Sequence, residues 1–510
     1  MTRKVFKGIL IGLLVLFVIT IALHLILAGV IKHKINTLDD EERIYRTEGA
    51  RINMLTGKIV LKNISVHARA TQKDSLAVRA ENALLTGIGI RDFFNTDVLQ
   101  FATLHISRPE IAYYKRKKPE DSKPSEKKKP VENTSGPEIQ LANLYIDSGR
   151  LTFFEENKDT VIHIKSLNLG LSNLRYNAQT KYKNIPFAYQ LDSLRFHDFF
   201  YGLNELENLK IAEIKGDSTY ISSYNAQIIP KYDKVAFQKH LEREKDRITL
   251  QVDTLNIKNY NITLHDGLTD LYIDSLEVKQ AGLELYRNKQ MPDQIKYKPL
   301  YSQMLRELPF HLQVNNIDIN RSKISYIEQM DFSVPGGVVS FSEFNASITG
   351  INNDKNFDED TRIAIDCKFM ASAPLQVEWD FKINSKDDDF TIKGHLQDLD
   401  ATHINSILIP NNRLKLSGKI QQMYFNFYGN NYVAHGAMKM AYDEFKVEVL
   451  EEDTNKLKKL ISFVANILID KDNTLQEKEE HIGDVQRDQQ KSFFSYLWLC
   501  IKKGTVDTLL

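Results

Sequence analysis

The sequence has few cysteines and no excess of charge of either sign. Only Cys367 and Cys500 occur among 510 residues, which is too few for a disulfide framework and gives no metal-ligand spacing. Lysine plus arginine and aspartate plus glutamate both number 67, so the chain lacks the basic surplus that phosphate binding normally needs. We therefore expect no nucleic-acid partner and no fold that depends on disulfides.

Catalytic and cofactor motifs are also absent. The sequence contains no metalloprotease His-Glu-x-x-His, no Gly-x-Ser-x-Gly, no Walker loop and no dinucleotide fingerprint. Gly216-Asp217-Ser218 is similar to the nucleophile block of some esterases, but it lies between apolar strand segments, where a turn is the simpler interpretation. The acidic stretch 354–360 lacks the glycine and spacing of a calcium loop. We expect no catalytic residue, no metal site, no cofactor and no enzymatic activity.

One long apolar run stands near the N-terminus. It extends from Ile9 through Leu16 to Ile31 and is interrupted only by Thr20, His24 and small residues. A helix of this length rises about 35 Å, which is enough to cross a hydrocarbon core of about 30 Å. The run predicts a transmembrane anchor helix.

The flanking charges favour a cytoplasmic N-terminus. Basic residues precede the run without any acidic residue, whereas acidic residues at 39–42 follow it. A cleaved signal peptide has the same basic start, but residues 25–28 lack a small-x-small cleavage pattern and the run is longer than a usual signal core. An uncleaved anchor is the favoured interpretation.

From about Thr47 onwards the sequence consists mostly of short segments that alternate apolar and polar residues, as in 58–62 and 65–69. Period-two alternation rich in Ile, Leu, Tyr, Phe and Thr predicts a mainly β body. Helical spacing is clearest only at 235–246, 299–307 and 454–469.

One strand signature recurs along this body. Two apolar residues separated by one residue are followed by a polar or glycine-containing middle. Two more apolar residues with the same separation come after that middle. The step from the second apolar residue to the third is five, as in Ile106 to Ile111, Ile146 to Leu151, Ile257 to Ile262 and Ile319 to Ile324, with a weaker copy at 212–221. An odd step would turn the side chains to the opposite face of an unbroken strand. The middle therefore predicts a tight turn or a bulge.

Two segments depart from the strand pattern. Residues 115–137 are rich in lysine and proline and almost free of apolar residues, which predicts a flexible loop. A contact with anionic lipid headgroups is the alternative for this polybasic loop. Near the C-terminus, the spacing of apolar residues at 456–469 predicts an amphipathic helix. The apolar cluster at 493–501 is too short to span a bilayer. That cluster could lie in a membrane interface or pack against the last strands, and packing is favoured.

Several short motifs resemble AsmA-like proteins of bacterial envelopes. After the anchor, LTGKIVLKNISV (55–66), GIGIRDFF (87–94) with LHISRPEI (104–111), and LYIDSGRLTFF (144–154) look like the opening elements and the recurring strand pair of that family. The ending FFSYLW (493–498) with IKKG (501–504) is similar to the tail of a Bacteroidota-type branch.

The resemblance implies an elongated, twisted, repeating β-groove with an apolar inner face that lets phospholipid pass between membranes. It implies no catalytic residue. The groove lining would comprise the apolar residues of the repeated signature, namely Ile106, Ile111, Ile146, Leu151, Phe153, Ile214, Ile257, Ile262, Leu264, Ile319, Ile324 and Tyr326. Alternation alone also fits a closed sandwich or barrel, in which two apolar faces cover each other.

The sequence thus predicts three regions. Residues 1–35 form a cytoplasmic stub and an inner-membrane anchor, 36–450 form a periplasmic β-groove with a few short helices, and 451–510 form a helical C-terminal end. The expected partners are phospholipid or another acyl lipid, the inner membrane, and an outer membrane or an envelope protein. The alternative function is a structural or assembly scaffold of the cell envelope that binds a protein partner.

Overall fold

The computed structural model describes most of the body of the chain. The described residues are 43–53, 56–68, 75–87, 98–115, 138–155, 159–177, 187–264, 268–450 and 476–509. The expected anchor at 9–31, the polybasic residues 116–137 and the expected helix at 456–469 lie outside them. Within the described ranges, no helix has both the length and the apolar character needed to cross a membrane.

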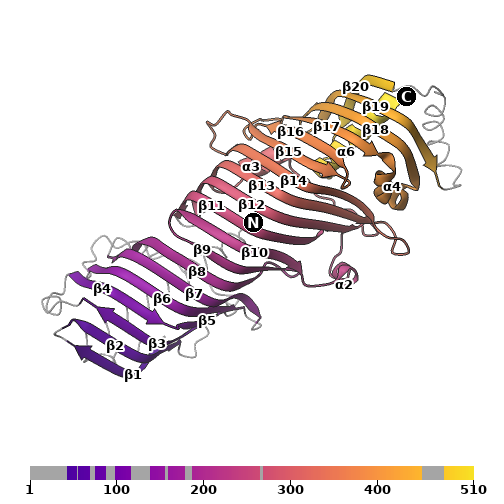
Figure 1. Ribbon diagram of the computed structural model, residues 1–510. Coiled ribbons are helices and arrows are strands. Elements are labelled where there is room, and N and C mark those ends of the chain that lie inside the picture. Colours follow the sequence, from indigo (N-terminus) through magenta and orange to yellow (C-terminus); the bar gives the residue numbers. More distant parts are fainter. Residues whose placement is uncertain are drawn as a thin grey trace, which may run out of the picture. The chain divides into compact units, whose positions relative to one another are not determined.

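Twenty strands dominate the described chain and belong to one mixed sheet (Figure 1), which confirms the mainly β fold. The strands are β1 (Arg43–Asn53), β2 (Lys58–Ala68), β3 (Ser75–Thr86), β4 (Val98–Ser107), β5 (Glu110–Tyr114), β6 (Glu138–Phe154), β7 (Thr160–Tyr176), β8 (Ala188–Gly202), β9 (Glu207–Gly216), β10 (Tyr220–Pro230), β11 (Arg247–Leu264), β12 (Leu268–Asn288), β13 (His311–Gln329), β14 (Gly337–Asn352), β15 (Thr361–Phe369), β16 (Ala373–Phe381), β17 (Phe390–Asp400), β18 (Leu414–Gly429), β19 (Val433–Val449) and β20 (Gln476–Gln486).

The described helices are few and short, as the sequence predicts. They are α2 (Lys234–Gln238), α3 (Tyr301–Arg306), the 3-10 turn η2 (Ala401–Ile404), α4 (Asn405–Asn412) and α6 (Phe493–Leu509). The first two fall within the helical patterns seen at 235–246 and 299–307. The short α4 was not predicted from the sequence, because it contains a proline, Pro410, and buries no residue fully.

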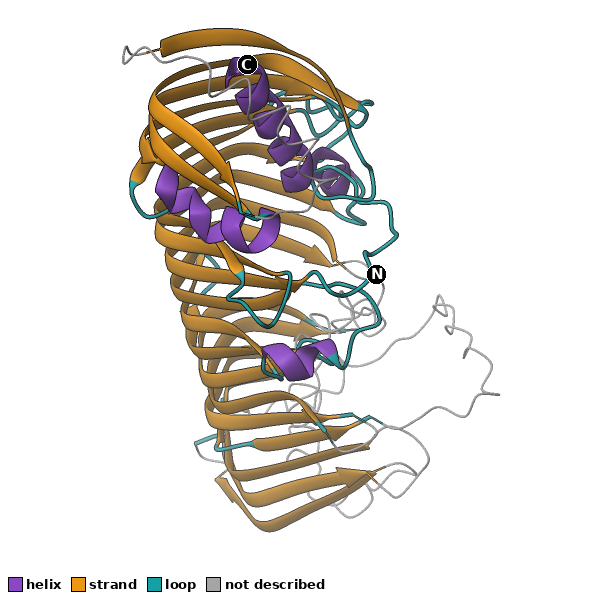
Figure 2. Cartoon of the chain, turned by 90° about the vertical axis from the view of Figure 1, so that its right-hand side faces the viewer, coloured by secondary structure: helices purple, strands orange, loops and turns teal. Residues whose placement is uncertain are grey.

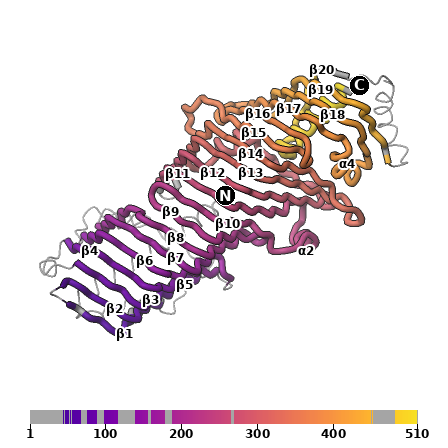
Figure 3. The backbone as a smooth tube through the Cα atoms, in the orientation of Figure 1, coloured from indigo at the N-terminus to yellow at the C-terminus, as the bar shows by residue number. Residues whose placement is uncertain are grey.

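The chain divides into two compact units. Unit 1 comprises residues 1–225 and 259–270, and unit 2 comprises 226–258 and 271–510. Within unit 1, β1 to β3 pair antiparallel, β4 and β5 both pair with β3 and both run parallel to β6, and β6 to β9 pair antiparallel. Within unit 2, β13 to β20 follow one another antiparallel, as the steady colour change in Figure 3 shows.

All four strong copies of the signature have an irregular backbone where a tight turn or a bulge is predicted. Each has one non-glycine residue with positive φ, always two positions after the second apolar residue: Arg108 (φ 48°), Ser148 (φ 51°), Asn259 (φ 49°) and Arg321 (φ 50°). The pairing register shifts around Ser148 and Arg321. The left-handed residue therefore corrects the odd step and keeps the apolar side chains on one face.

An asparagine on the next strand satisfies the backbone amide at two of these bulges. The amide of Ser148 donates to Asn168 Oδ1 at 3.0 Å, and the amide of Arg321 donates to Asn345 Oδ1 at 2.9 Å. A bulge removes its amide from the regular hydrogen bonds between strands. A side-chain acceptor therefore avoids the unfavourable free energy of an unpaired donor. The same device serves β6–β7 in unit 1 and β13–β14 in unit 2.

The C-terminal end differs from the expected helical region. Residues 476–486 form β20, which pairs antiparallel with β19. Only Ile482 and Val485 of this strand are buried apolar residues, so its charged sequence lacks the alternation that identifies the other strands. The apolar cluster at 493–501 lies in α6, and α6 packs on β19 and β20, as the favoured alternative predicts.

Candidate functional site

The expected lining residues of unit 1 form a buried core. They leave between 1% and 4% of their surface exposed, in the set Ile106, Ile111, Ile146, Leu151 and Phe153. Ile214 is half-buried and packs against the same cluster. The pairing places Ile106 opposite Ile146 and Ile111 opposite Leu151, so these positions share one face. In unit 1 that face is filled by its own side chains.

The remaining expected positions are more exposed. Ile257, Ile319, Ile324 and Tyr326 are half-buried, and Ile262 leaves 47% of its surface exposed. Leu264 ends β11, and its side chain lies outside the described part of the structure. The repeated signature therefore gives a tight core at 106–153 of unit 1 and half-buried positions in unit 2, whereas Ile262, in the 259–270 segment of unit 1, is exposed.

A first apolar ladder crosses seven strands of unit 2. The register joins directly opposed residues of β13 to β19 in the order Ile319, Ala346, Ile365, Val377, Gly394, Phe425 and Met438. Directly opposed residues of antiparallel strands point to the same face. The glycine in this ladder is required, because a Cβ on Gly394 would lie 2.0 Å from the ring of Phe425.

A second apolar ladder runs beside the first on the same face. It joins Ile317, Ile348, Ile363, Trp379, Ile392 and Phe427 from β13 to β18. Its members on β13 to β16 are half-buried, whereas Ile392 is 3% and Phe427 1% exposed. The apolar face is thus open at its β13–β16 side and closed at its β17–β19 side.

Helix α6 closes that end of the face (Figure 2). The ring of Phe493 stacks on Trp379 with centroids 4.5 Å apart and meets Phe390 edge-on at 5.2 Å. Further along the helix, a Cβ on Gly504 would lie 2.5 Å from Ile482 Cδ1 and 2.9 Å from Met438 Cε. Buried residues every three or four positions make one side of α6 apolar, and that side covers the ends of both ladders.

The open part of the face is a strip of aliphatic side chains on three neighbouring strands. We define this uncovered strip as Ile317, Ile319 and Ile324 of β13, Ile348 of β14 and Ile365 of β15. All five are half-buried, and none belongs to the buried core of either unit. Contiguous exposed apolar surface of this kind is rare on soluble proteins unless something binds there. The strip is therefore the candidate functional site.

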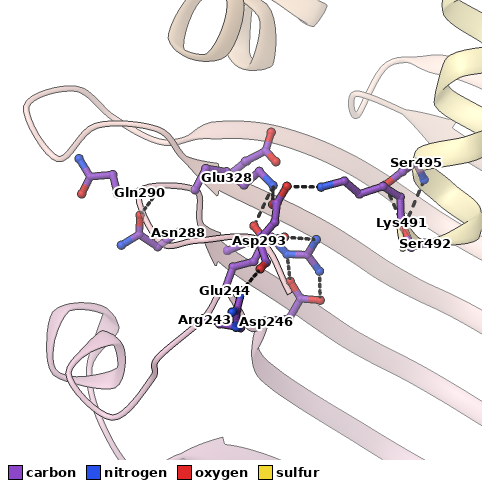
Figure 4. Close-up of polar contacts among 12 residues, drawn as sticks. Arg243, Glu244, Asp246, Asn288, Gln290, Asp293, Glu328, Lys491, Ser492 and Ser495 are labelled. Carbon is purple, nitrogen blue, oxygen red and sulfur yellow. Dashed lines mark hydrogen bonds and ion pairs between the residues drawn. The ribbon is translucent and has the colours of Figure 1, made fainter. Parts of the chain in front are cut away.

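A network of charged residues fixes the loop and the terminal segment beside α6 (Figure 4). Glu244, whose side chain is 3% exposed, accepts a hydrogen bond from Lys289 Nζ at 2.8 Å and lies 4.0 Å from Arg287. Arg287 donates two hydrogen bonds to Asp246, at 2.7 and 2.6 Å. Glu244 and Asp246 precede β11, whereas Arg287 and Lys289 lie at the C-terminal end of β12. The network therefore joins these two strand ends.

One ion pair ties this network to the segment that leads into α6, and Arg487 fixes the same segment through separate hydrogen bonds. Asp293 pairs with Lys491, two residues before the helix, and with Lys289 at 3.5 Å. Buried Arg487 donates to Asn431 Oδ1 and, at 2.5 Å, to the carbonyl of Lys298. We call residues Glu244, Asp246, Arg287, Lys289, Asp293, Arg487 and Lys491 the polar clamp. It holds the helix over the end of the apolar face.

The polar clamp should weaken in acid. The hydrogen bond from Lys491 holds the pKa of Asp293 well below its usual range, despite partial desolvation. A carboxyl whose pKa is lowered on folding stabilises the fold fully above its unfolded pKa of about 3.9, and less as the pH falls through the folded pKa. Asp293→Asn should remove part of the loss of stability between pH 5 and pH 2. Urea unfolding followed by tryptophan fluorescence at several pH values measures this.

An equal pH dependence in the wild type and in Asp293→Asn would contradict the assignment of acid sensitivity to this ion pair. Asp387→Asn is a suitable control. Asp387 is an exposed residue of unit 2, and its backbone carbonyl accepts a hydrogen bond from Asn431, which is not a residue of the polar clamp.

The Gly216-Asp217-Ser218 block is a turn, as predicted. Asp217 Oδ1 accepts hydrogen bonds from the amide and hydroxyl of Thr219 at 2.7 and 2.6 Å. These hydrogen bonds lower the pKa of the Asp217 carboxyl, and they close the turn between β9 and β10. Residues 216–218 therefore reverse the direction of the chain between β9 and β10.

Both cysteines are buried thiols. Burial raises the pKa of the Cys367 thiol to about 12 and that of the Cys500 thiol to about 11, so both are protonated at neutral pH. In the described ranges, no group of three or more His, Cys, Asp or Glu is arranged to hold a metal ion. Comparison of the sequence with protein-family models and with curated proteins finds no match.

Sequence reasoning located the apolar face and the packing of the cluster 493–501 on the last strands, but it missed the residues that fix that helix in place. The polar clamp joins residues from 244 to 491, and pairs so far apart in sequence leave no local pattern. Trp379, which stacks with Phe493, also lies outside the repeated signature. The only signal for its role is its position in an alternating strand, two residues after Val377.

Proposed function

We propose that the chain binds acyl chains of lipid on the uncovered strip and acts as a non-enzymatic lipid carrier or conduit. The observation that carries this proposal is the pair of apolar ladders, which run side by side across unit 2 and are uncovered at their β13–β15 side. Burial of a methylene group is worth about 0.8 kcal/mol. An acyl chain along the strip would therefore bury the part of these side chains that remains exposed.

The cellular setting belongs to the same proposal. The apolar run from Ile9 to Ile31 would anchor the chain in the inner membrane of a bacterial envelope, with the N-terminus in the cytoplasm and the β body in the periplasm. A fixed position beside a bilayer gives a lipid-binding body direct access to its ligand. The AsmA-like resemblance of the strand motifs supports this arrangement, with phospholipid as the ligand and outer-membrane biogenesis as the role.

Site-specific photocrosslinking in cells tests the proposal. A photoreactive amino acid at Ile365 should yield a crosslinked phospholipid, because Ile365 belongs to the uncovered strip. The same group at Ala364 should yield much less, because the adjacent residue is exposed on the opposite face of β15. Mass spectrometry of the purified adducts identifies the lipid. A second variant, Ile319→Asp, should decrease the yield at Ile365 by placing a charge in the strip.

Equal lipid crosslinking at positions 364 and 365, or none at 365, would contradict the proposal. The alternative is a scaffold that binds an envelope protein. It is favoured by the outer side of α6, where Phe494, Trp498 and Leu499 remain 60%, 51% and 42% exposed. A single protein adduct at Trp498 in stoichiometric amounts, without lipid at Ile365, would select that function.

A further inference from the structure

The polar face of unit 2 contains an elongated hollow. Its volume is about 930 Å³, and it is lined by three consecutive residues from each of the seven strands β13 to β19. The middle residue of each set belongs to the first apolar ladder, and the two flanking residues point to the other face of the sheet. Two parallel rows of side chains therefore border the hollow.

The lining residues place this hollow on the face opposite the uncovered strip. Residues of the second apolar ladder, such as Ile363, Trp379 and Phe427, do not border it, and neither does any described residue of α6. The flanking side chains that do border it are mostly polar, and half of them are exposed, such as Asp366 and Glu378. The hollow is thus a groove between two rows of mostly polar side chains. Ile319 and Ile365 of the uncovered strip are also among its lining residues, but their side chains point to the other face of the sheet.

The dimensions of the groove suit a long and narrow ligand. Six steps of about 4.8 Å between seven strands give a length of about 29 Å, and the two rows stand about 7 Å apart along each strand. The groove runs across the strands, whose backbone groups are already paired within the sheet. A ligand here must therefore be recognised by side chains, which excludes a peptide that adds as a further strand.

The charges along the groove nearly cancel. Three carboxylates, Asp318, Asp366 and Glu378, stand among two lysines, Lys393 and Lys439, and several amides. This balance provides no basic track for a nucleic-acid backbone. Carboxylates, amides and lysines in one groove provide both acceptors and donors, which is the chemistry that a row of hydroxyl groups requires.

An aromatic platform stands in one row of the groove. His395 and Tyr424 are directly opposed on β17 and β18, and their rings stack with centroids 4.0 Å apart and planes 10° apart. Tyr424 is 42% exposed, so its ring offers an apolar surface in a polar surrounding. Such a surface packs well against the C–H side of a sugar ring, while the neighbouring polar groups bind its hydroxyls.

Two buried polar atoms beside the platform have no hydrogen-bond partner. They are His395 Nε2 and Asn426 Oδ1, which lie in opposite rows of the groove on neighbouring strands. Unpaired buried polar atoms are uncommon in folded proteins. Asn426 Nδ2 donates to the hydroxyl of Tyr428 at 2.8 Å. His395 Nε2 and Asn426 Oδ1 therefore keep unused hydrogen-bonding capacity beside the groove.

We propose that this groove binds a linear polysaccharide, with the free face of the Tyr424 ring packed against one sugar ring and His395 stacked behind Tyr424. The polar face would then hold a hydroxyl-rich polymer. The site depends on residues of β13 to β19 alone, so it does not rest on the proposed lipid function.

Binding of defined hexasaccharides tests this proposal. The full chain in mild detergent is titrated by calorimetry with three probes: the β-1,4-linked hexamers of N-acetylglucosamine and of glucose, and a hexamer of galacturonate. At least one hexamer should bind in the millimolar range or tighter, and its monosaccharide should bind at least about ten-fold more weakly, because a single ring fills only part of the groove. Tyr424→Ala should weaken the hexamer by about ten-fold, and His395→Ala should weaken it too.

Tyr432→Ala is the matched control. Tyr432 is an exposed tyrosine in the turn between β18 and β19 and does not border the groove, so its removal should leave the affinity unchanged. No binding of any hexamer, binding that does not depend on chain length, or equal loss in the Tyr424 and Tyr432 variants would overturn the proposal. Lipid crosslinking at Ile365 should persist in Tyr424→Ala, which separates this site from the lipid site.

Discussion

Replacing Phe493 with alanine should lower the free energy of unfolding of unit 2 by about 3–5 kcal/mol, the usual cost of removing a buried phenylalanine ring. Phe493 is 5% exposed and lies at the centre of an aromatic group. Its ring stacks on Trp379 at 4.5 Å and meets Phe390 and Tyr301 edge-on at 5.2 and 6.1 Å. The loss therefore combines desolvation, a cavity and several ring contacts.

The two tryptophans make this prediction easy to measure. The chain contains only Trp379 and Trp498, and both lie in unit 2, one under α6 and one on its outer side. In Phe493→Ala, urea unfolding followed by tryptophan emission should have an earlier midpoint. The emission of the native state should shift to the red, because Trp379 loses its stacking partner and gains water.

The adjacent residue provides the control. Phe494 is 60% exposed, so Phe494→Ala removes the same side chain from the same turn of the helix and should change the stability by no more than about 0.5 kcal/mol. Equal losses in the two variants would mean that α6 is not docked through its Phe493 side. The covered end of the apolar face would then have to be closed in another way.

The repeated signature shows how far the sequence can be interpreted. The odd step from Ile146 to Leu151 and from Ile319 to Ile324 predicts an irregular residue between them, and Ser148 and Arg321 occupy that position with positive φ. Periodicity is a property of neighbouring residues, so it can be derived without knowing the fold. The asparagines that accept from these bulges are on other strands, and nothing near Ser148 or Arg321 in the sequence indicates them.

Burial could not be predicted in the same way. Ile146 and Ile319 occupy the same position of the signature, but Ile146 is 1% exposed and Ile319 is half-buried. The difference comes from the surroundings: Ile146 packs within the core of unit 1, whereas Ile319 belongs to neither buried core. Alternation specifies which face a side chain occupies, and the rest of the chain decides whether that face is covered.

Opposite faces of the same strands carry the two proposed sites for the same reason. Ile365 belongs to the uncovered strip, and its neighbour Asp366 borders the polar groove. A strand that alternates strictly has to offer one apolar and one polar surface. The sequence predicted the apolar surface because its residues resemble a known pattern. The groove was missed because exposed polar residues of a strand usually have no function beyond solubility.

Glu244→Gln should destabilise unit 2 by about 3 kcal/mol, since removing one partner of a buried ion pair leaves its counterion without compensation. The side chain of Glu244 is 3% exposed, and it faces Lys289 and Arg287, which are 24% and 19% exposed. Asp246 still pairs with Arg287 in the variant, whereas Lys289 keeps only its longer contact of 3.5 Å with Asp293, so the loss falls mainly on Lys289. The same urea titration with tryptophan emission measures the change.

A second substitution distinguishes the lost charge from a general disturbance of the loop. Lys289→Met removes the uncompensated cation but keeps a long apolar side chain, so adding it to Glu244→Gln should recover part of the lost stability. Glu242→Gln, two residues away on an exposed position, should have no measurable effect. If the double variant were as unstable as the sum of the two single variants, Glu244 and Lys289 would not be coupled. The polar clamp would then hold α6 through Lys491 and Arg487 alone, and the end of the apolar face would depend on the packing of Phe493.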